Sequence, residues 1–373
     1  MAEERQTKKE DELFLSLPRE RGFASSDLYL FQEFWCSSTF IKEINIFQKQ
    51  FQAKDNDIIV ASFPKSGTTW LKAIAFAIVN RQCFSSIHNH PLLTSNPHQL
   101  VPYIGFMSPA NSHFPTTEPR LFGTHIPFPS LSKSIIDSNC KIIYICRNPF
   151  DTFISAWHFF NKIRQYCSSS ALTIEEAFEM YCNGIIEFGP WWSHMLGYWE
   201  ESIVRPNKIL ILKYEDIKEN VNLYVKRVAD FLDFPFTQEE ESNGVIESII
   251  RLCSFEKMKD LEVNKSGIIY EALENKHYFR KAEIGGWKHS KSIVRREIRA
   301  FELFHLFKGC ILELRGESGG GVDLLSRLVH VPYIDMNIIF GGCCLYMVKL
   351  FECGVGVSCQ RVARDCGPNC PHS

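Results

Sequence analysis

The sequence predicts an α/β protein with a P-loop-like fold, in which a central, mostly parallel sheet is flanked by helices. Short apolar runs alternate along the chain with longer segments of helical periodicity, as strands and helices alternate in doubly wound folds. Two of these runs, residues 58–63 and 140–146, are apolar almost throughout, which is typical of parallel strands buried on both faces. A polar turn with one glycine separates the first run from an apolar, helix-like segment.

The individual elements follow from these patterns. Strands are expected over 58–63, from Leu121 to the prolines that follow it, over 140–146 and over 208–213. Helices are expected over 70–79, 152–163, 173–202 and 222–232. In such folds ligands bind at the carboxyl ends of the strands, which is where Lys65, His125 and Arg147 lie.

Two further segments have less regular patterns. Residues 13–50 carry aromatic residues in helical and irregular spacing, and we expect them to pack over the core or a binding cleft. Residues 88–113 contain several prolines, asparagines and serines and are interpreted as a long loop, of the kind that often lines a binding site.

Composition excludes several classes of protein. The chain has 373 residues, of which 45% are hydrophobic, and a formal net charge of −2, so we expect a sizeable core but no nucleic-acid partner and no attraction to acidic membranes. The longest apolar run, residues 336–348, is too short to span a membrane. The first twelve residues are highly charged and lack the apolar stretch of a signal peptide. We therefore expect a cytoplasmic protein with a disordered lead-in over residues 1–14.

The fourteen cysteines do not form a recognisable framework. Seven are scattered between Cys36 and Cys253, and the other seven lie from Cys310 onward. Without a secretory signal we expect reduced thiols. Cys366, Cys370 and His372 could imitate half of a zinc site, but no partner half is visible, so no metal is predicted.

The polar turn after the first strand is suited to a phosphate. Residues 64–70 read Pro-Lys-Ser-Gly-Thr-Thr-Trp, which provides an amine, hydroxyls, a flexible glycine and the start of a helix. Free backbone N–H groups and the helix dipole favour anions at such a position. The turn lacks the spacing of a Walker loop. An ordinary connection between a strand and a helix is the alternative interpretation.

Arg147 suggests a second phosphate contact. It follows the strand over 140–146, where P-loop kinases often place an acidic residue that helps to hold Mg²⁺. A guanidinium there indicates direct, metal-independent phosphate binding, and Ser155 could add a hydroxyl from the next helix. Alternatively, Arg147 forms a structural ion pair with Asp151.

Two other groups are candidates for the same site. His125 lies at a strand end, where a neutral imidazole could accept a proton from a hydroxyl, although strand-end histidines are usually structural. Arg280 and Lys281 precede a turn that contains Gly285 and Gly286, and they could clamp a phosphate or form an ordinary surface charge pair.

Together these motifs resemble the cytosolic PAPS-dependent sulfotransferases, and the plant branch in particular, over residues 15–288. PAPS is 3′-phosphoadenosine 5′-phosphosulfate. Supporting details are the segments that begin at Leu28, His98, Thr124, Lys213 and Cys253. The resemblance implies a sulfotransferase domain over 15–288 that transfers the sulfuryl group of PAPS to a hydroxyl of a small metabolite such as a flavonoid, steroid or hydroxy acid.

The resemblance also implies residue roles. His125 would be the catalytic base, and Lys65 would neutralise charge on the leaving phosphate. The 5′-phosphosulfate would be held by Lys65, Ser66, Gly67, Thr68 and Thr69. The 3′-phosphate would be held by Arg147, Ser155, Arg280 and Lys281. The adenine would be bordered by Trp70, Tyr214, Cys253 and Phe255.

Some positions depart from the family pattern. Gly123 stands two residues before His125, where animal members often carry a lysine. Ala282 and Gly286 replace the usual glycine and aspartate of the last motif, and if position 282 needs a positive φ, the alanine would cost about 1 kcal/mol or more. Residues 289–373 are unlike the family's usual ending, and we expect a poorly ordered, atypical cysteine-rich tail.

Three functions remain in view. The leading hypothesis is an active sulfotransferase, because Lys65, His125, Arg147 and Ser155 are all present. The altered last motif leaves open an impaired protein that binds PAPS or PAP, its desulfated product, without catalysis. A P-loop kinase is disfavoured by the missing Walker spacing and by Arg147.

Overall fold

The structure is a computed structural model that describes residues 14–24, 27–84, 87–105, 117–270 and 273–290. The chain separates into two units, Met1–His289 and Ser290–Ser373, and all described residues except Ser290 belong to the first. The expected lead-in, nearly all of the cysteine-rich tail and the possible zinc half-site therefore lie outside the described residues.

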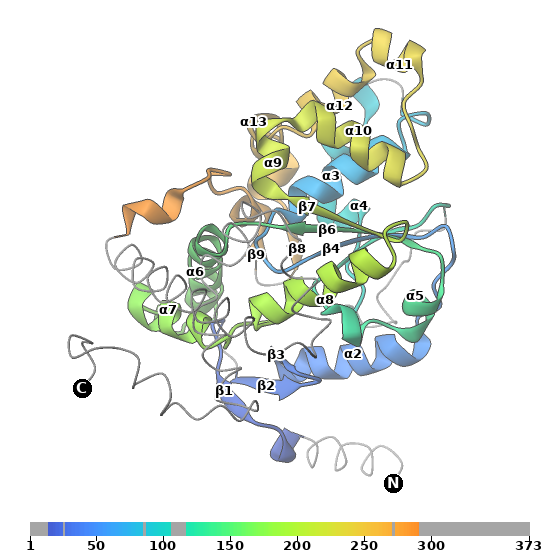
Figure 1. The fold of residues 1–373 in the computed structure, drawn as a ribbon. Helices are drawn as coiled ribbons and strands as arrows, with labels where there is room; N and C mark the ends of the chain where they lie inside the picture. Colours follow the sequence, from blue (N-terminus) through green and yellow to red (C-terminus); the bar gives the residue numbers. More distant parts are fainter. Residues whose placement is uncertain (1–13, 25–26, 85–86, 106–116, 271–272, 291–373) are drawn as a thin grey trace, which may run out of the picture. The chain divides into compact units, whose positions relative to one another are not determined.

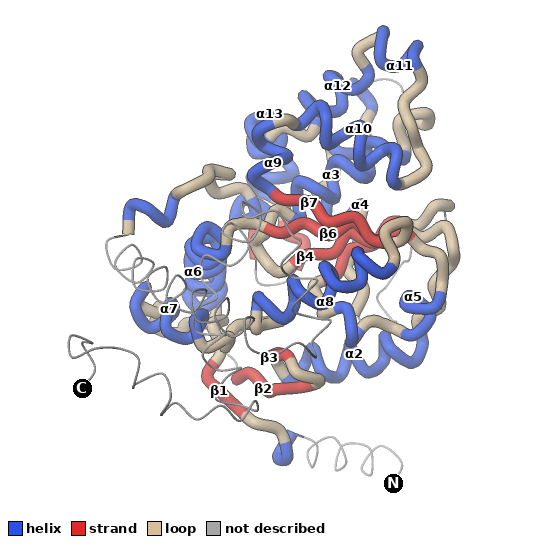
Figure 2. Tube along the Cα trace, in the orientation of Figure 1, coloured by secondary structure: helices blue, strands red, loops and turns tan. Residues whose placement is uncertain are grey.

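A sheet of four parallel strands forms the centre of the first unit (Figure 2). Its spatial order is β5-β4-β6-β7, and every neighbouring pair is parallel. The strands are β4 (Ile58–Ser62), β5 (Leu121–Thr124), β6 (Lys141–Cys146) and β7 (Ile209–Lys213). All five residues of β4 are buried, as expected of a central parallel strand. The predicted sheet is thus confirmed.

Helices cover both faces of this sheet (Figure 1). Helices α3 (Thr68–Val79), α10 (Val221–Phe231) and α12 (Val245–Leu252) lie together on one face. Their apolar side chains share one buried cluster with β4, β6 and β7. Helix α8 (Trp191–Val204) packs against β7 from the opposite face. The two-sided cover explains why the strands are apolar throughout.

The remaining helices surround this core, and several begin at a capping side chain. Helix α6 (Pro149–Tyr166) starts three residues before the predicted start, because the Asn148 side chain accepts hydrogen bonds from Phe150 N and Asp151 N. The others are α2 (Ser38–Gln50), α4 (Pro97–Leu100), α5 (Lys133–Asp137), α7 (Ile174–Cys182), α9 (Tyr214–Glu219), α11 (Gln238–Ser242), α13 (Phe255–Lys259) and α14 (Glu262–Ser266). Strands β8 (Ile268–Tyr270) and β9 (Leu273–Glu274) form a small antiparallel pair.

The prediction of one helical stretch over 173–202 is wrong. Helix α7 ends at Cys182 and α8 begins at Trp191. Gly184 has φ +77°, and Pro190 caps the start of α8. Proline has no N–H and disfavours helical backbone before it, so the helix cannot continue through residue 190.

Residues 13–50 contain a sheet that the sequence patterns did not reveal. Strands β1 (Arg19–Arg21), β2 (Asp27–Phe31) and β3 (Phe34–Cys36) pair antiparallel, and α2 follows. The strands have three to five residues, too few for a clear alternating pattern. Backbone hydrogen bonds from Trp35 N to Gly189 O (2.8 Å) and from Phe188 N to Trp35 O (2.7 Å) join this sheet to the connection between α7 and α8.

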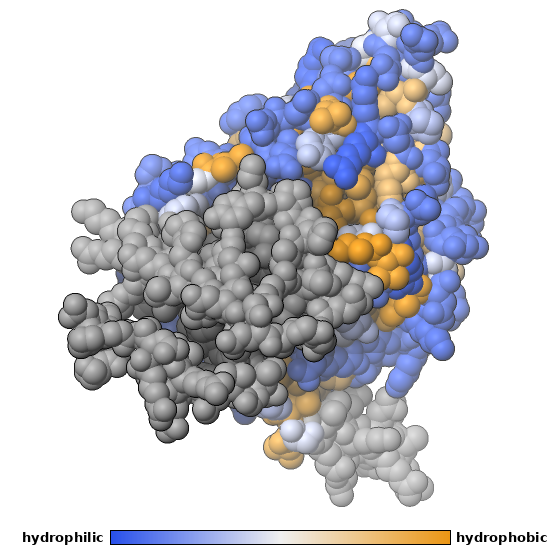
Figure 3. All heavy atoms as spheres, viewed as in Figure 1, coloured by the Kyte–Doolittle hydropathy of each residue, from blue (hydrophilic) through white to orange (hydrophobic). Residues whose placement is uncertain are grey.

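The predicted loop over 88–113 holds short helical pieces in its described part. These are the 3-10 turns Ile87–Asn89 and Pro91–Leu93, and α4. Residues 106–116 lie outside the described residues. The described surface seen in Figure 3 is mostly hydrophilic over α10 to α12, with apolar residues in small groups. No helix in the described part of the chain is long and apolar enough to cross a membrane.

Candidate active site

The turn between β4 and α3 is shaped to receive an anion. Gly67 precedes the first residue of α3 and has φ +113°. A Cβ at position 67 would lie only 2.8 Å from Cδ2 of Tyr214, so glycine is required both for backbone conformation and for space. The free N–H groups at the start of this twelve-residue helix face the turn. The predicted phosphate turn therefore has suitable geometry.

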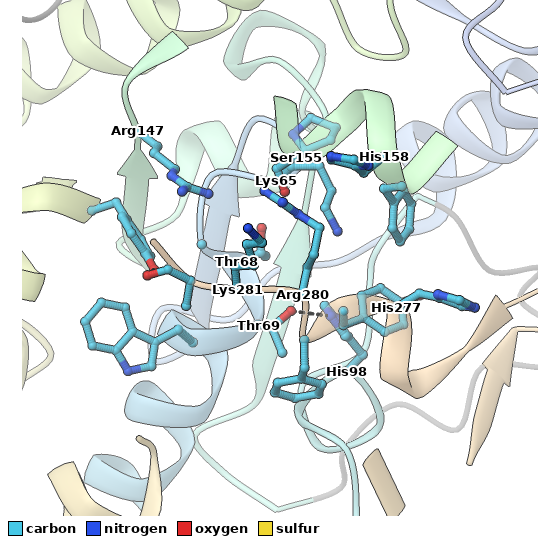
Figure 4. A pocket seen from close by; sticks show the side chains of 18 of the residues that line it. Lys65, Thr68, Thr69, His98, Arg147, Ser155, His158, His277, Arg280 and Lys281 are labelled. Atoms are coloured by element: carbon cyan, nitrogen blue, oxygen red, sulfur yellow. Dashed lines mark hydrogen bonds between the residues drawn. The ribbon is translucent and has the colours of Figure 1, made fainter. Parts of the chain in front are cut away.

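Lys65 brings a positive charge to this turn. Its backbone is left-handed, with φ +70°, and its Nζ lies 3.7 Å from the centroid of the Phe159 ring. Burial, together with the nearby cations Arg280 and Arg147, lowers the pKa of Lys65 to about 7. Three basic side chains thus lie around one cavity, and Figure 4 shows that they come from separate segments of the chain.

Arg147 occupies the carboxyl end of β6, as predicted. Its guanidinium lies 4.6 Å from the centroid of the Tyr214 ring, and its Nη2 donates to Glu283 O at 2.5 Å. Its Nε is buried and has no hydrogen-bond partner. A buried guanidinium N–H without an acceptor is costly, so an anionic ligand would satisfy it.

Asp151 does not form the alternative ion pair with Arg147. Its Oδ2 accepts a hydrogen bond from Gly285 N at 2.7 Å, and its Oδ1 accepts one from Trp287 N at 3.4 Å. Asp151 therefore holds the segment after Arg280 and Lys281 against the start of α6. This arrangement leaves the charge of Arg147 available to a ligand.

The turn after Lys281 is strained as the sequence suggested. Ala282 has φ +55°, a left-handed conformation that disfavours residues with a Cβ. Its carbonyl accepts a hydrogen bond from the Tyr214 hydroxyl at 3.0 Å. Burial and the neighbouring Arg147 lower the pKa of Arg280.

His125 has a defined tautomer at the end of β5. Its Nδ1 lies 2.7 Å from the carbonyl oxygen of Ser62, which can only accept, so Nδ1 carries the proton. Its Nε2 lies 2.9 Å from the Tyr103 hydroxyl and therefore accepts a hydrogen bond from it. Burial is the main reason that the pKa of His125 falls to about 3. The imidazole is therefore neutral at physiological pH, and its unprotonated Nε2 can accept a proton once a substrate hydroxyl takes the place of the Tyr103 hydroxyl.

One cavity of about 900 Å³ unites these groups. Of the predicted site residues, the cavity is lined by Lys65, Gly67, Thr68, Thr69, Trp70, His125, Arg147, Ser155, Tyr214, Cys253, Phe255, Arg280 and Lys281. Ser66 is the exception, because it is 2% exposed and does not line the cavity. In the described part of the chain, no three or more His, Cys, Asp or Glu side chains form a group that could hold a metal ion.

The cavity has an apolar end near His125. Phe40, Phe160, Phe188 and Tyr103 line the cavity. The Phe188 ring lies 5.9 Å from the His125 ring and 5.4 Å from the Phe40 ring. An aromatic chamber beside a neutral imidazole can hold a small organic molecule and place its hydroxyl at Nε2. Cationic and aromatic ends in one cavity suit a reaction between an anionic donor and an apolar acceptor.

A sequence profile described as the sulfotransferase domain matches residues 55–301, which is more than half of the chain. The chain belongs to the sulfotransferase family. The sulfotransferase is 50% identical over 283 residues to cytosolic sulfotransferase 15 of Arabidopsis thaliana, covering 74% of this chain and 79% of that protein. It is 46% identical over 269 residues to flavonol 4′-sulfotransferase of Flaveria chlorifolia, covering 70% and 82%.

A solved structure supports the fold of the sulfotransferase. The crystal structure of mouse sulfotransferase SULT7A1 complexed with PAP matches with a TM-score of 0.53 at 24% identity, covering 73% of this chain and 92% of that one. The family, the fold class and the enzyme class expected from the sequence are therefore confirmed. The names of the Arabidopsis relatives agree with the expected cytoplasmic location.

Among the residues of the sulfotransferase site that were not assigned a role from the sequence are Lys72, His98 and Tyr103. Nε2 of His98 lies 2.9 Å from the Thr69 hydroxyl. His98 begins one of the similar segments, but nothing in its neighbours indicated this contact. Lys72 is the one charged residue within the apolar run 70–79, and this isolation was the available signal.

Proposed function

We propose that this sulfotransferase uses PAPS as donor and transfers its sulfuryl group to a hydroxyl of a small metabolite. The observation that carries the proposal is the single cavity that joins Lys65, Arg147 and Arg280 at one end to His125 at the other. The unpartnered Nε of Arg147 and the gathering of Lys65, Arg147 and Arg280 around one cavity are features that a phosphorylated nucleotide would satisfy.

The nucleotide would be held by two sets of groups. The turn of residues 65–69 would hold the 5′-phosphosulfate with backbone N–H groups, the Lys65 amine and the threonine hydroxyls. Arg147, Ser155, Arg280 and Lys281 would hold the 3′-phosphate. The rings of Trp70 and Tyr214 are in edge-to-face contact at 5.6 Å, and with Cys253 and Phe255 they would border the adenine.

The residues then divide the chemistry between them. PAPS supplies an activated sulfuryl group whose S–O bond to the 5′-phosphate breaks as a new S–O bond forms with the acceptor. Nε2 of His125 takes the proton from the acceptor hydroxyl. Lys65 stabilises the negative charge that develops on the departing phosphate. The aromatic chamber orients the acceptor and excludes water from it.

The acceptor is proposed to be a small hydroxylated molecule such as a flavonoid, steroid or hydroxy acid. The chamber of Phe40, Phe160 and Phe188 supports this class because flat or compact apolar bodies pack well against aromatic rings. The similarity to a flavonol 4′-sulfotransferase makes flavonols the first compounds to test.

The test is an assay of the purified full chain with PAPS and a panel of flavonols, steroids and hydroxy acids. We expect a sulfated product, and we expect His125→Ala to lower its rate about 10²- to 10⁴-fold without weakening PAP binding. PAP binding with no product from any acceptor would instead indicate the impaired, binding-only protein. A variant that transfers as fast as the wild type would remove His125 from the mechanism.

A further inference from the structure

Lys72 is a buried cation that the proposed reaction does not use. It lies on α3, one turn beyond the phosphate turn, and is 0% exposed. Its Nζ lies 2.8 Å from Val101 O, 3.3 Å from Nδ1 of His98 and 3.2 Å from the centroid of the Tyr103 ring. No acidic side chain in the described part of the chain pairs with it. Burial of an amine without an acidic partner costs free energy of folding, which indicates that Lys72 has a function at this position.

The three contacts match the three N–H groups of an ammonium. The Val101 carbonyl and the negative face of the Tyr103 ring both attract an N–H and repel a lone pair. Burial lowers the pKa of Lys72, whereas the carbonyl and the ring face favour the charged form. An ammonium accounts for all three contacts with its three N–H groups, and because it has no lone pair it donates to Nδ1 of His98. A neutral amine would instead accept from that nitrogen, so the position of the His98 proton distinguishes the two forms.

This direction determines the next hydrogen bond. Burial and the nearby Lys72 hold the pKa of His98 well below its ordinary value, so the ring is neutral and carries one proton. With Nδ1 accepting from Lys72, that proton is on Nε2, which lies 2.9 Å from the Thr69 hydroxyl oxygen (Figure 4). Thr69 then accepts from His98 and keeps its own proton to donate elsewhere. Thr69 lines the cavity beside Lys65.

Gly123 makes this arrangement possible. A Cβ at position 123 would lie 2.2 Å from Cε and 2.3 Å from Nζ of Lys72, distances that atoms cannot adopt without displacement of the amine. Gly123 is a middle residue of β5, and it has no positive φ that would require glycine. Glycine at position 123 therefore leaves space for the Lys72 amine, and is not needed for the backbone conformation.

We propose that Lys72 and His98 are positioning residues that orient the Thr69 hydroxyl so that its proton points at a bound phosphosulfate, with Gly123 providing the space for the amine. The proposal rests on the proposed function, since it assumes a nucleotide at residues 65–69. With the opposite tautomer, Thr69 would donate to His98 and turn only oxygen lone pairs toward the anion, which repels them. Lys72 thus acts through two other residues and does not contact the nucleotide.

The test combines Lys72→Met with Thr69→Val in a double-mutant cycle read by calorimetric titration with PAP. Methionine fills the same space without a donor. We expect Lys72→Met to raise the dissociation constant for PAP about tenfold, as for the loss of one hydrogen bond to a charged group. In the Thr69→Val background it should have almost no further effect, because the hydroxyl that it orients is gone. If Lys72→Met raised the dissociation constant equally with Thr69 and with Val at position 69, the proposal would be overturned, because Lys72 would then have a general structural role that does not act through the Thr69 hydroxyl.

Gly123→Ala is the matched variant that displaces the amine and leaves Lys72 in the chain. It should raise the dissociation constant for PAP as Lys72→Met does. In a Lys72→Ala background, where the amine is gone and the space is free, Gly123→Ala should cause no further rise in that constant. Retention of full affinity by Gly123→Ala alone would contradict the proposed link. A wild-type protein that does not bind PAP would instead refute the proposed function, so the two failures are distinguishable.

A spectroscopic measurement keeps the proposal testable if Lys72→Met does not fold. The ¹⁵N shifts of the His98 ring in the wild-type protein report which nitrogen carries the proton. We expect the proton on Nε2. A ring protonated on Nδ1 would overturn the proposed direction of the hydrogen bonds.

Discussion

Lys65 shows how one side chain can depend on its electrostatic surroundings. The amine lies among aromatic rings and near Arg147 and Arg280, and its pKa of about 7 is far below the ordinary 10.5. In the free protein burial, and after it repulsion from Arg280 and Arg147, disfavours the charged form of Lys65. A bound phosphate would reverse this effect, because an adjacent anion favours the protonated amine.

Binding of PAP should therefore be linked to proton uptake at Lys65. At pH 8 the free protein has a largely neutral Lys65, and the complex has a charged one, so about one proton is taken up and affinity falls as the pH rises above about 7. Calorimetric titrations at pH 8 in buffers with different ionisation enthalpies measure this number directly. Lys65→Met is the control and should show no such uptake. A buffer-independent heat with the wild-type protein would contradict the prediction.

At the scale of an element, the turn after Arg280 and Lys281 fixes how this segment lies against the cavity. Asp151 holds Gly285 N and Trp287 N, and Tyr214 holds the carbonyl of Ala282. These bonds impose φ +55° on Ala282, where an alanine is less stable than a glycine by about 1 kcal/mol. Position 282 departs from the family motif in the sequence, and the structure shows that its backbone has the positive φ at which an alanine costs free energy.

Ala282→Gly should relieve this strain and stabilise the folded protein. Because Ala282 already has φ +55° without a bound nucleotide, we expect a gain of about 1 kcal/mol in the free energy of unfolding in urea and little change in PAP affinity. Ser168→Gly is a matched comparison, because Ser168 also has a positive φ of 54° and does not line the cavity. It should stabilise the fold by a similar amount. A free energy of unfolding for Ala282→Gly equal to or below that of the wild type would contradict the strain.

At the scale of the whole folded unit, the aromatic end of the cavity is assembled from distant segments. The small sheet β1–β3 is joined to the connection between α7 and α8 by backbone hydrogen bonds of Trp35. Glu187 lies in that connection, is 4% exposed and accepts a hydrogen bond from Ala24 N at 3.0 Å through Oε1. Its Oε2 is buried without a partner. Burial raises the pKa of Glu187 to about 7.

This carboxyl group should make stability depend on pH. Its folded pKa lies above the unfolded value of 4.5, so the folded state binds the proton more tightly, and stability is highest below about pH 4.5 and falls as the pH rises through 7. Glu187→Gln keeps the acceptor for Ala24 N and removes the charge. We expect its free energy of unfolding in urea to match the wild type at pH 5 and to exceed it by up to about 3 kcal/mol at pH 8. If the free energies of unfolding of Glu187→Gln and the wild type differed by the same amount at pH 5 and pH 8, Glu187 would not be a buried carboxyl group that ionises between these pH values.

The sequence by itself determined the central sheet and most of the cation-lined end of the cavity. Patterns such as the apolar run 58–63 and the turn of residues 64–70 are local, because a strand, a tight turn and a helix start depend on neighbouring residues. The carboxyl ends of parallel strands then meet at one edge, which is why Lys65, His125 and Arg147 could be placed together before the structure was known.

Only the tertiary structure decided which side chains meet across the chain. The Lys72 amine fills the space beside Gly123, and the Tyr103 hydroxyl contacts Nε2 of His125. The connection between α7 and α8 brings Glu187 and Phe188 to the lining of the cavity. These contacts join residues that are far apart in sequence, so no local periodicity encodes them. They depend on how helices and loops pack around the sheet, which is a property of the folded whole.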